Sequence, residues 1–266
     1  MKRLYLALSG GGAHAAAHIG FLRGLDEAEI PVAGVAGVSG GALAAAAWAG
    51  GGDLDTMIER AGNLHPWTWV RGWGGGLLSG TRLGAMIEEF LPTATFEGLR
   101  APLWVLATDL DTGEPVVLKD GDLREAVRAT CSFPGMFPPM QVGPRRLVCG
   151  EVSEVVPVRV ARQMAGDDGV VVAVDCNAGA RWPMASSFTA IAVRAGLTVV
   201  RGRTREDLLG ADLVIAPSIG ESGWMRPRRI PGFAVAGLAA AREAAPELRR
   251  FAHSDALPQK VVRLPR

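Results

Sequence analysis

Ser39 stands in a pentapeptide whose spacing is typical of a serine nucleophile. The segment Gly37-Val38-Ser39-Gly40-Gly41 matches G-x-S-x-G and lies between a short apolar run and an Ala-rich helical run. A strand that turns abruptly into a helix exposes the side chain at the turn and directs the helix N-terminus at any anion formed there. The pattern predicts a nucleophile, and a turn in which Ser39 merely caps the helix fits the pentapeptide equally well.

A second glycine-rich turn, Gly10-Gly11-Gly12-Ala13, follows the first apolar run of the chain. Successive backbone N–H groups at a helix N-terminus can stabilise an oxyanion. The spacing also fits the G-x-G-x-x-G/A dinucleotide fingerprint, which requires an acidic residue at the end of the second strand. That strand leads into Ser39 with no carboxylate, so the pairing of the two turns favours an oxyanion hole over a nucleotide site or an empty turn.

Both turns need a parallel sheet to bring them together. Residues 4–8 and 32–36 read as buried strands, and residues 16–28 and 42–48 read as helices, which is a β-α-β-α order. We expect a single α/β domain over residues 1–266, with a mostly parallel central sheet flanked by helices. Further elements are expected at the following ranges: strands 170–174 and 213–216, helices 187–200 and 233–248, and an edge strand through 261–262.

Composition narrows the functional classes. The chain has 266 residues and a net charge of +1, so no global field favours nucleic acid. Its three cysteines lack metal-ligand spacing, and we expect no metal or cofactor and a reducing, cytoplasmic location. The chain has no apolar run of about 18 residues, so we predict no membrane-spanning helix. The tryptophan-rich segment 65–76 predicts a cover over an acyl site at a membrane surface, or simply a cover over the core. The basic stretch 201–205 predicts peripheral contact with anionic lipid, or a solvated helix end.

Several blocks resemble the bacterial patatin-like phospholipases. The order and spacing agree from about residue 4 to residue 178, and the blocks are Leu8–Ala13, Ala16–Gly20, Gly37–Leu43, Gly76–Gly80, Ala107–Glu114 and Arg124–Pro139. The resemblance implies a patatin-like α/β fold with a nucleophile elbow at Ser39. It also implies that an aspartate takes the serine proton and that the Gly10–Ala13 loop stabilises the oxyanion.

The chain departs from the family pattern at the catalytic aspartate. The D-G-G or D-G-A motif of the family aligns with Cys149-Gly150-Glu151, so Cys149 holds the aspartate position. A thiol with a pKa of about 8.5 is mostly protonated at neutral pH and is a poor proton acceptor. Two substitutes are conceivable. Glu151 lies two residues further along, and His14 lies in the glycine loop, where the family often has arginine.

Three functions follow from these observations. The first is a serine acyl hydrolase acting on lipid or other carboxylic esters through Ser39. The second is a pseudoenzyme or inactivated variant of the same fold that binds an acyl ligand, because Cys149 is a poor base. The third, a nucleotide-binding protein, lacks its acidic residue. We expect His18 to pack within its helix and Asp109 to support a turn, while the substrate head group and the oligomeric state stay open.

Overall fold

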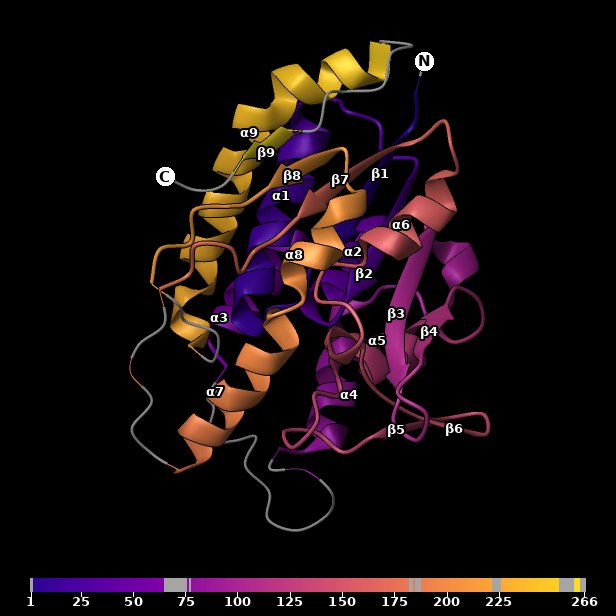
Figure 1. The fold of residues 1–266 in the computed structure, drawn as a ribbon, viewed down its shortest axis with the longest axis vertical. Helices are drawn as coiled ribbons and strands as arrows, with labels where there is room; N and C mark the ends of the chain where they lie inside the picture. The colour runs from indigo at the N-terminus through magenta and orange to yellow at the C-terminus, as the bar shows by residue number, and fades with distance from the viewer. Residues whose placement is uncertain are drawn as a thin grey trace.

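The computed structural model describes residues 2–64, 76, 78–181, 184, 188–221, 226–253 and 261–263. A twisted sheet runs through the centre of the molecule, and helices cover both of its faces (Figure 1). The strand order is β5-β6-β3-β2-β1-β7-β8-β9, and β4 pairs with β3 outside this path. Pairing is parallel from β3 through β9, and antiparallel where β3 meets β4 and β6 and where β5 meets β6.

The described residues form nine strands and nine α-helices. The strands are β1 (Leu4–Leu8), β2 (Gly34–Val38), β3 (Leu103–Asp109), β4 (Pro115–Leu118), β5 (Met140–Val142), β6 (Arg145–Cys149), β7 (Val170–Val174), β8 (Leu213–Ile215) and β9 (Val261–Arg263). The helices are α1 (Ala16–Glu27), α2 (Gly40–Ala49), α3 (Leu54–Gly62), α4 (Gly80–Phe90), α5 (Leu123–Cys131), α6 (Val158–Ala165), α7 (Phe188–Arg201), α8 (Thr204–Asp207) and α9 (Ile230–His253).

The central strands are buried on both faces. Alternate side chains of a strand point to opposite faces, so Leu4, Leu6 and Leu8 of β1 pack into the core beneath α1, α2 and α9. Tyr5 and Ala7 pack into a second core beneath α6. This burial explains why the strands read as continuous apolar runs, as strands of parallel sheets do.

The expected architecture is confirmed: the chain forms a single α/β domain with a mostly parallel central sheet flanked by helices. The expected strands at 4–8, 170–174 and 213–216 correspond to β1, β7 and β8, and the tail forms β9 beside β8. The antiparallel strands β4, β5 and β6 were not predicted. No helix among the described residues is long and apolar enough to cross a membrane.

The sheet register brings the predicted site residues to one edge. The parallel strands β1, β2 and β7 are neighbours, so the segments that leave their carboxyl ends lie side by side. Ser39 directly follows Val38, which pairs with Leu106. The next residue of β3, Ala107, pairs with Cys149 at the end of β6. Cys149 therefore lies two strands away from Ser39 at the same level of the sheet.

Candidate active site

Ser39 occupies a strained turn between β2 and α2. Its backbone angles are φ 53° and ψ −128°, and a positive φ is unfavourable for any residue with a Cβ atom. The Ser39 amide donates a 2.8 Å hydrogen bond to the hydroxyl of Thr130, which in turn donates to the Leu106 carbonyl. A Cβ atom on Gly41 would lie 2.5 Å from the Ser9 carbonyl oxygen. The second glycine of the motif thus lets the elbow pack directly against the end of β1.

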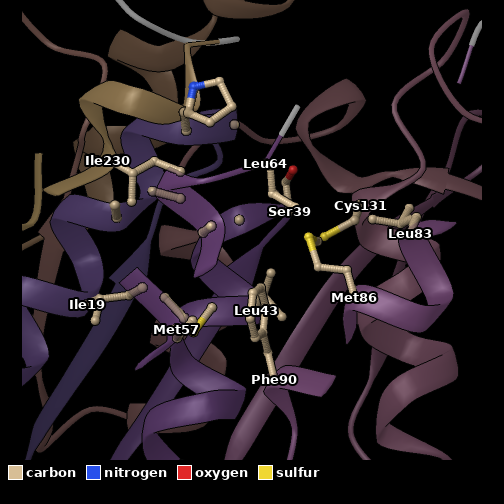
Figure 2. Close-up of a pocket in the computed structure, with 18 of the residues that line it drawn as sticks. Ile19, Ser39, Leu43, Met57, Leu64, Leu83, Met86, Phe90, Cys131 and Ile230 are labelled. Carbon is tan, nitrogen blue, oxygen red and sulfur yellow. The ribbon is translucent and has the colours of Figure 1, made fainter. Parts of the chain in front are cut away.

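An apolar cavity of ≈ 270 Å³ opens beside Ser39. Figure 2 shows the hydroxyl of Ser39 at its wall, with Leu43, Met57 and Phe90 extending to one side. Leu83, Met86 and Cys131 lie on the other side in the same view. The lining residues come from α1, α2, α3 and α4, from the end of α5, and from the start of α9. The space suits a hydrocarbon chain, because such pockets are mostly apolar with a few polar groups.

The glycine loop lies beside Ser39, and its residues have distinct surroundings. The Gly10 amide donates a 3.0 Å hydrogen bond to the Val155 carbonyl, so this N–H is already occupied. Gly11 and Gly12 have φ angles of 153° and 57°. Gly12 and Ala13 line the cavity next to Ser39. Of the four residues predicted for an oxyanion hole, Gly10 and Gly11 have amides directed at Val155 and Glu151, and the amides of Gly12 and Ala13 are the candidate donors.

Besides Thr130, Ser39 has three side-chain neighbours that interact with it: Cys131, Cys149 and Glu151. Burial raises the pKa of the Cys131 thiol to about 12. Burial also raises the pKa of Cys149, which is completely buried, well above its usual value, and the Glu151 charge adds to this effect. Both thiols therefore stay protonated at neutral pH and cannot accept a proton from Ser39.

Glu151 is folded back into the site. A 3₁₀ turn over Gly150–Val152 follows β6 and leaves the Glu151 side chain only 3% exposed. Burial raises the pKa of its carboxyl, and the Arg201 charge and hydrogen bonds from Ser39 and the Gly11 amide oppose that shift. The Cys149 Sγ atom lies 3.9 Å from Glu151 Oε1. The turn that begins at Gly150 thus directs the Glu151 side chain into the protein and not toward solvent.

His14, the other conceivable substitute, contacts Asn177 and Phe233. Its Nδ1 atom lies 3.2 Å from Asn177 Oδ1, and its ring packs edge-on against Phe233 with centroids 5.1 Å apart. Burial lowers the pKa of His14 to about 4. A catalytic Ser39–His14 pair stays a prediction. His18 is completely buried and its Nε2 atom lies 2.9 Å from the Ser9 carbonyl, as expected for a packed helix residue.

The remaining sequence candidates fall into supporting roles. Asp109 accepts hydrogen bonds from the amides of Asp111 and Thr112 and so fixes a turn. Asp175 is buried at the end of β7 and accepts a 2.9 Å hydrogen bond from the Asn177 amide. The described residues hold no group of three or more potential metal ligands. The tryptophan-rich segment 65–76 lies outside the described residues except for Gly76.

Arg201 lies near Glu151 and Asp175, although it belongs to a basic stretch. The basic stretch 201–205 suggested contact with lipid or solvent, yet Arg201 is partly buried and its charge acts on both Glu151 and Asp175. Its guanidinium donates a 3.0 Å hydrogen bond to Asn177. The apolar spacing of α7 gave no sign of this inward position. Thr130 and Cys131 were also missed as neighbours of Ser39, since β3 and α5 meet the elbow only in the folded chain.

Comparison with known proteins identifies the family of the chain. The model of the patatin-like phospholipase family matches residues 6–162, which is more than half of the chain, and the protein belongs to that family. An uncharacterised NTE family protein of Mycobacterium bovis is 32% identical over 178 residues, which cover 65% of this chain and 30% of the relative. The neuropathy target esterase sws of Drosophila grimshawi is 34% identical over 146 residues, which cover 51% of this chain and 10% of the relative.

These relatives are much longer than the match. The chain spans less than a third of the M. bovis relative and a tenth of the Drosophila esterase. Among solved structures, VipD from Legionella pneumophila aligns with a TM-score of 0.52 over 93% of this chain and 67% of its own, at 13% identity. At that identity the likeness concerns the fold alone. The family supports hydrolysis of lipid esters in general, and the activity of this chain is a matter for proposal.

Proposed function

We propose that the protein is a serine hydrolase that cleaves carboxylic esters of lipids or of other acyl compounds. The observation that carries this proposal is Ser39, held at a strained elbow with its hydroxyl at the wall of an apolar cavity. The cavity takes the acyl chain and leaves the ester carbonyl next to Ser39. Substrate binding then supplies the proximity that makes nucleophilic attack efficient.

The loop after β1 completes the reaction geometry. Attack of Ser39 Oγ on the carbonyl carbon moves negative charge onto the carbonyl oxygen, and the amides of Gly12 and Ala13 are the donors that stabilise it. Fixed donors of this kind contribute roughly 10²–10³-fold each in serine hydrolases. The N-terminus of α2 adds a partial positive charge on the same side.

The experiment combines hydrolysis of p-nitrophenyl esters with labelling by a fluorophosphonate. The native protein should release p-nitrophenol and carry one label on Ser39, located by peptide mass spectrometry. Ser39→Ala should abolish both. Ser153→Ala removes a hydroxyl that lies 2.8 Å from Thr108, away from the nucleophile, and is the matched control. A label on another residue, or hydrolysis that survives Ser39→Ala, would contradict the proposal.

A second candidate function is binding of an acyl ligand without turnover, which the thiol at Cys149 specifically favours. In that case a fluorescent fatty acid should bind in a 1:1 ratio, and no ester of any chain length should be hydrolysed faster than by Ser39→Ala. Peripheral contact with a membrane is a further proposal, based on the tryptophan-rich segment. Sedimentation with vesicles of anionic and of neutral phospholipids tests it.

A further inference from the structure

We propose that Glu151 is the general base for Ser39, in the role that the family gives to an aspartate at the position of Cys149. The inference rests on the proposed hydrolase function and adds a residue to it. It replaces the Ser–Asp pair implied by the family resemblance with a Ser–Glu pair in which the carboxylate comes from the turn after β6 instead of from its last residue.

The carboxylate is built into the site. A Cβ atom on Gly10 would lie 2.1 Å from Glu151 Oε1, so the first glycine of the loop leaves the space that the carboxylate fills. The Ser39 side chain and the Gly11 amide both interact with this carboxyl group and favour its ionised form. Within the described part of the chain, Glu151 Oε2 is buried with no partner at full hydrogen-bond geometry. An oxygen in that state can receive a proton or hold a water molecule.

The segment that carries Glu151 is held in place from both ends. The Gly10 amide donates to the Val155 carbonyl, and the Val155 and Val156 amides donate to the Asp207 carboxylate, the Val155 bond being 2.8 Å long. At the other end the Cys149 amide donates a 2.9 Å hydrogen bond to the Ser132 carbonyl. A base must be positioned within hydrogen-bond reach of its proton before its pKa matters, and these contacts provide that positioning.

The neighbours of Ser39 differ in whether they can accept a proton at neutral pH. The Cys131 and Cys149 thiols remain protonated at neutral pH because burial raises the pKa of each. Glu151 is the neighbour whose ordinary pKa, about 4.3, lies well below neutrality. The Arg201 charge favours its ionised form, while burial and the Asp175 charge favour the protonated form. A carboxylate whose pKa is raised toward neutrality is a stronger base than an ordinary glutamate.

The proton balance is complete with these groups and water. As Ser39 Oγ bonds to the carbonyl carbon, its proton moves to the Glu151 carboxylate. The tetrahedral intermediate then expels the alcohol, which takes the proton from Glu151. Water next attacks the acyl-serine and gives a proton to Glu151. Collapse of the second intermediate returns that proton to Ser39 Oγ and releases the carboxylic acid.

The test measures the rate constant for acylation of Ser39 by p-nitrophenyl esters in rapid mixing, and for its phosphonylation by a fluorophosphonate. Glu151→Gln keeps the shape of the side chain and removes the base. We expect acylation to fall by about 10²–10⁴-fold, the range of general-base catalysis. The matched control is Glu154→Gln, which changes a second buried glutamate on the same segment that pairs with Arg159 instead. It should leave the rate within about threefold of the native value.

The pH profile separates a base from a packing residue. Native acylation should rise with pH through a single ionisation above the ordinary pKa of glutamate, because burial raises the pKa of Glu151. This rise should be absent from Glu151→Gln. Should Glu151→Gln fail to fold by circular dichroism, Glu151→Asp retains the charge but withdraws the carboxylate by one methylene. Acylation of Glu151→Asp should be at least 10-fold slower than that of the native protein, and its rate should still rise with pH through one ionisation.

The outcomes distinguish this inference from the function on which it rests. If the native protein acylates at Ser39 and Glu151→Gln keeps the native rate and pH profile, the base assignment is overturned while the hydrolase proposal stands. A faster Glu151→Gln would show that the carboxylate blocks the oxyanion hole, which also overturns the assignment. If the native protein shows no Ser39-dependent reaction with any ester, both proposals fail.

Discussion

Gly10 and Glu151 occupy interdependent positions, because a Cβ atom on Gly10 would lie 2.1 Å from Glu151 Oε1 and 2.2 Å from its Cδ atom. A contact of that length is impossible, so one of the two groups must move if Gly10 gains a side chain. The Gly10 backbone is held by the Val155 carbonyl. The glutamate side chain is the group that must move, and it would leave Ser39.

Gly10→Ala is therefore expected to reduce ester hydrolysis at least 10-fold, through loss of the Glu151 position. Gly232→Ala is the control, because Gly232 is exposed on α9 and its Cβ would meet nothing within 4 Å. The combined variant Gly10→Ala with Glu151→Ala should unfold at a higher temperature than Gly10→Ala alone, since the clash is gone. Equal melting temperatures for the single and combined variants would rule out the steric explanation.

The strained backbone at Ser39 supports activity and lowers the stability of the fold. Residues held in such sparsely populated conformations cost of order 1–3 kcal/mol. Ser39→Gly should thus raise the free energy of unfolding by about 1 kcal/mol after the extra flexibility of glycine in the unfolded chain is subtracted, and it should abolish hydrolysis. Glu29, with φ 54°, is the other described non-glycine residue with a positive φ. Glu29→Gly should also raise the free energy of unfolding, and this variant should still hydrolyse esters. Urea unfolding measures both effects.

The local turns of this site can be predicted from the sequence, whereas its contacts between distant segments cannot. The elbow and the glycine loop are local patterns, because both are short turns between an apolar strand and a helix, and the structure places them side by side as expected. Arg201, Thr130 and the inward turn of Glu151 depend on contacts between residues distant in the chain. The antiparallel strands β4, β5 and β6 are short and partly exposed, so their apolar runs are too weak to define them.

Restoring the family aspartate at Cys149 should create a conflict with Glu151. The Cys149 Sγ atom lies 3.9 Å from Glu151 Oε1, and two buried carboxylates at such a distance cannot both ionise without a large cost. Cys149→Asp should lose stability as pH rises from 5 to 8, by at least about 1 kcal/mol, the equivalent of about one pKa unit. Thermal midpoints across this range measure the loss.

Removing the Glu151 carboxylate should relieve the repulsion that Cys149→Asp introduces. Cys149→Asp combined with Glu151→Gly recreates the motif of the patatin-like family, so it should be active and show no such loss of stability with pH. Glu151→Gly alone should be inactive. An active Glu151→Gly, or a double variant as sensitive to pH as Cys149→Asp, would contradict the assigned relationship between the two positions.

The cavity should determine the preferred acyl length. Ala61 lines it from α3, so Ala61→Leu reduces the space for the end of the chain. Excluding three methylenes costs about 2.4 kcal/mol at roughly 0.8 kcal/mol each, or about 50-fold in kcat/KM for long esters. Butyrate esters should be unaffected. Glu59→Leu, on the exposed side of α3, is the control. A uniform loss for all chain lengths would argue against this cavity as the acyl site.

The buried histidines make the fold sensitive to mild acid. Burial lowers the pKa of His18 to about 4 from an ordinary 6.5, and it does the same to His14. Between these values the unfolded chain binds more protons than the folded one, so the free energy of unfolding falls as pH drops from 6.5 toward 4. Each histidine should cost about 2 kcal/mol by pH 5 on this basis.

Substitution of His18 isolates its share of this loss. His18→Gln does not titrate, and its side-chain amide can still donate to the Ser9 carbonyl, which His18 now contacts at 2.9 Å. Urea unfolding at pH 7, 6 and 5 should show a smaller decrease for His18→Gln than for the native protein, by about 2 kcal/mol at pH 5. Comparison with the native protein cancels the opposite contribution of buried carboxyl groups such as Asp175, whose pKa is raised by burial. Parallel curves for the two proteins would mean that His18 does not titrate on unfolding in this range.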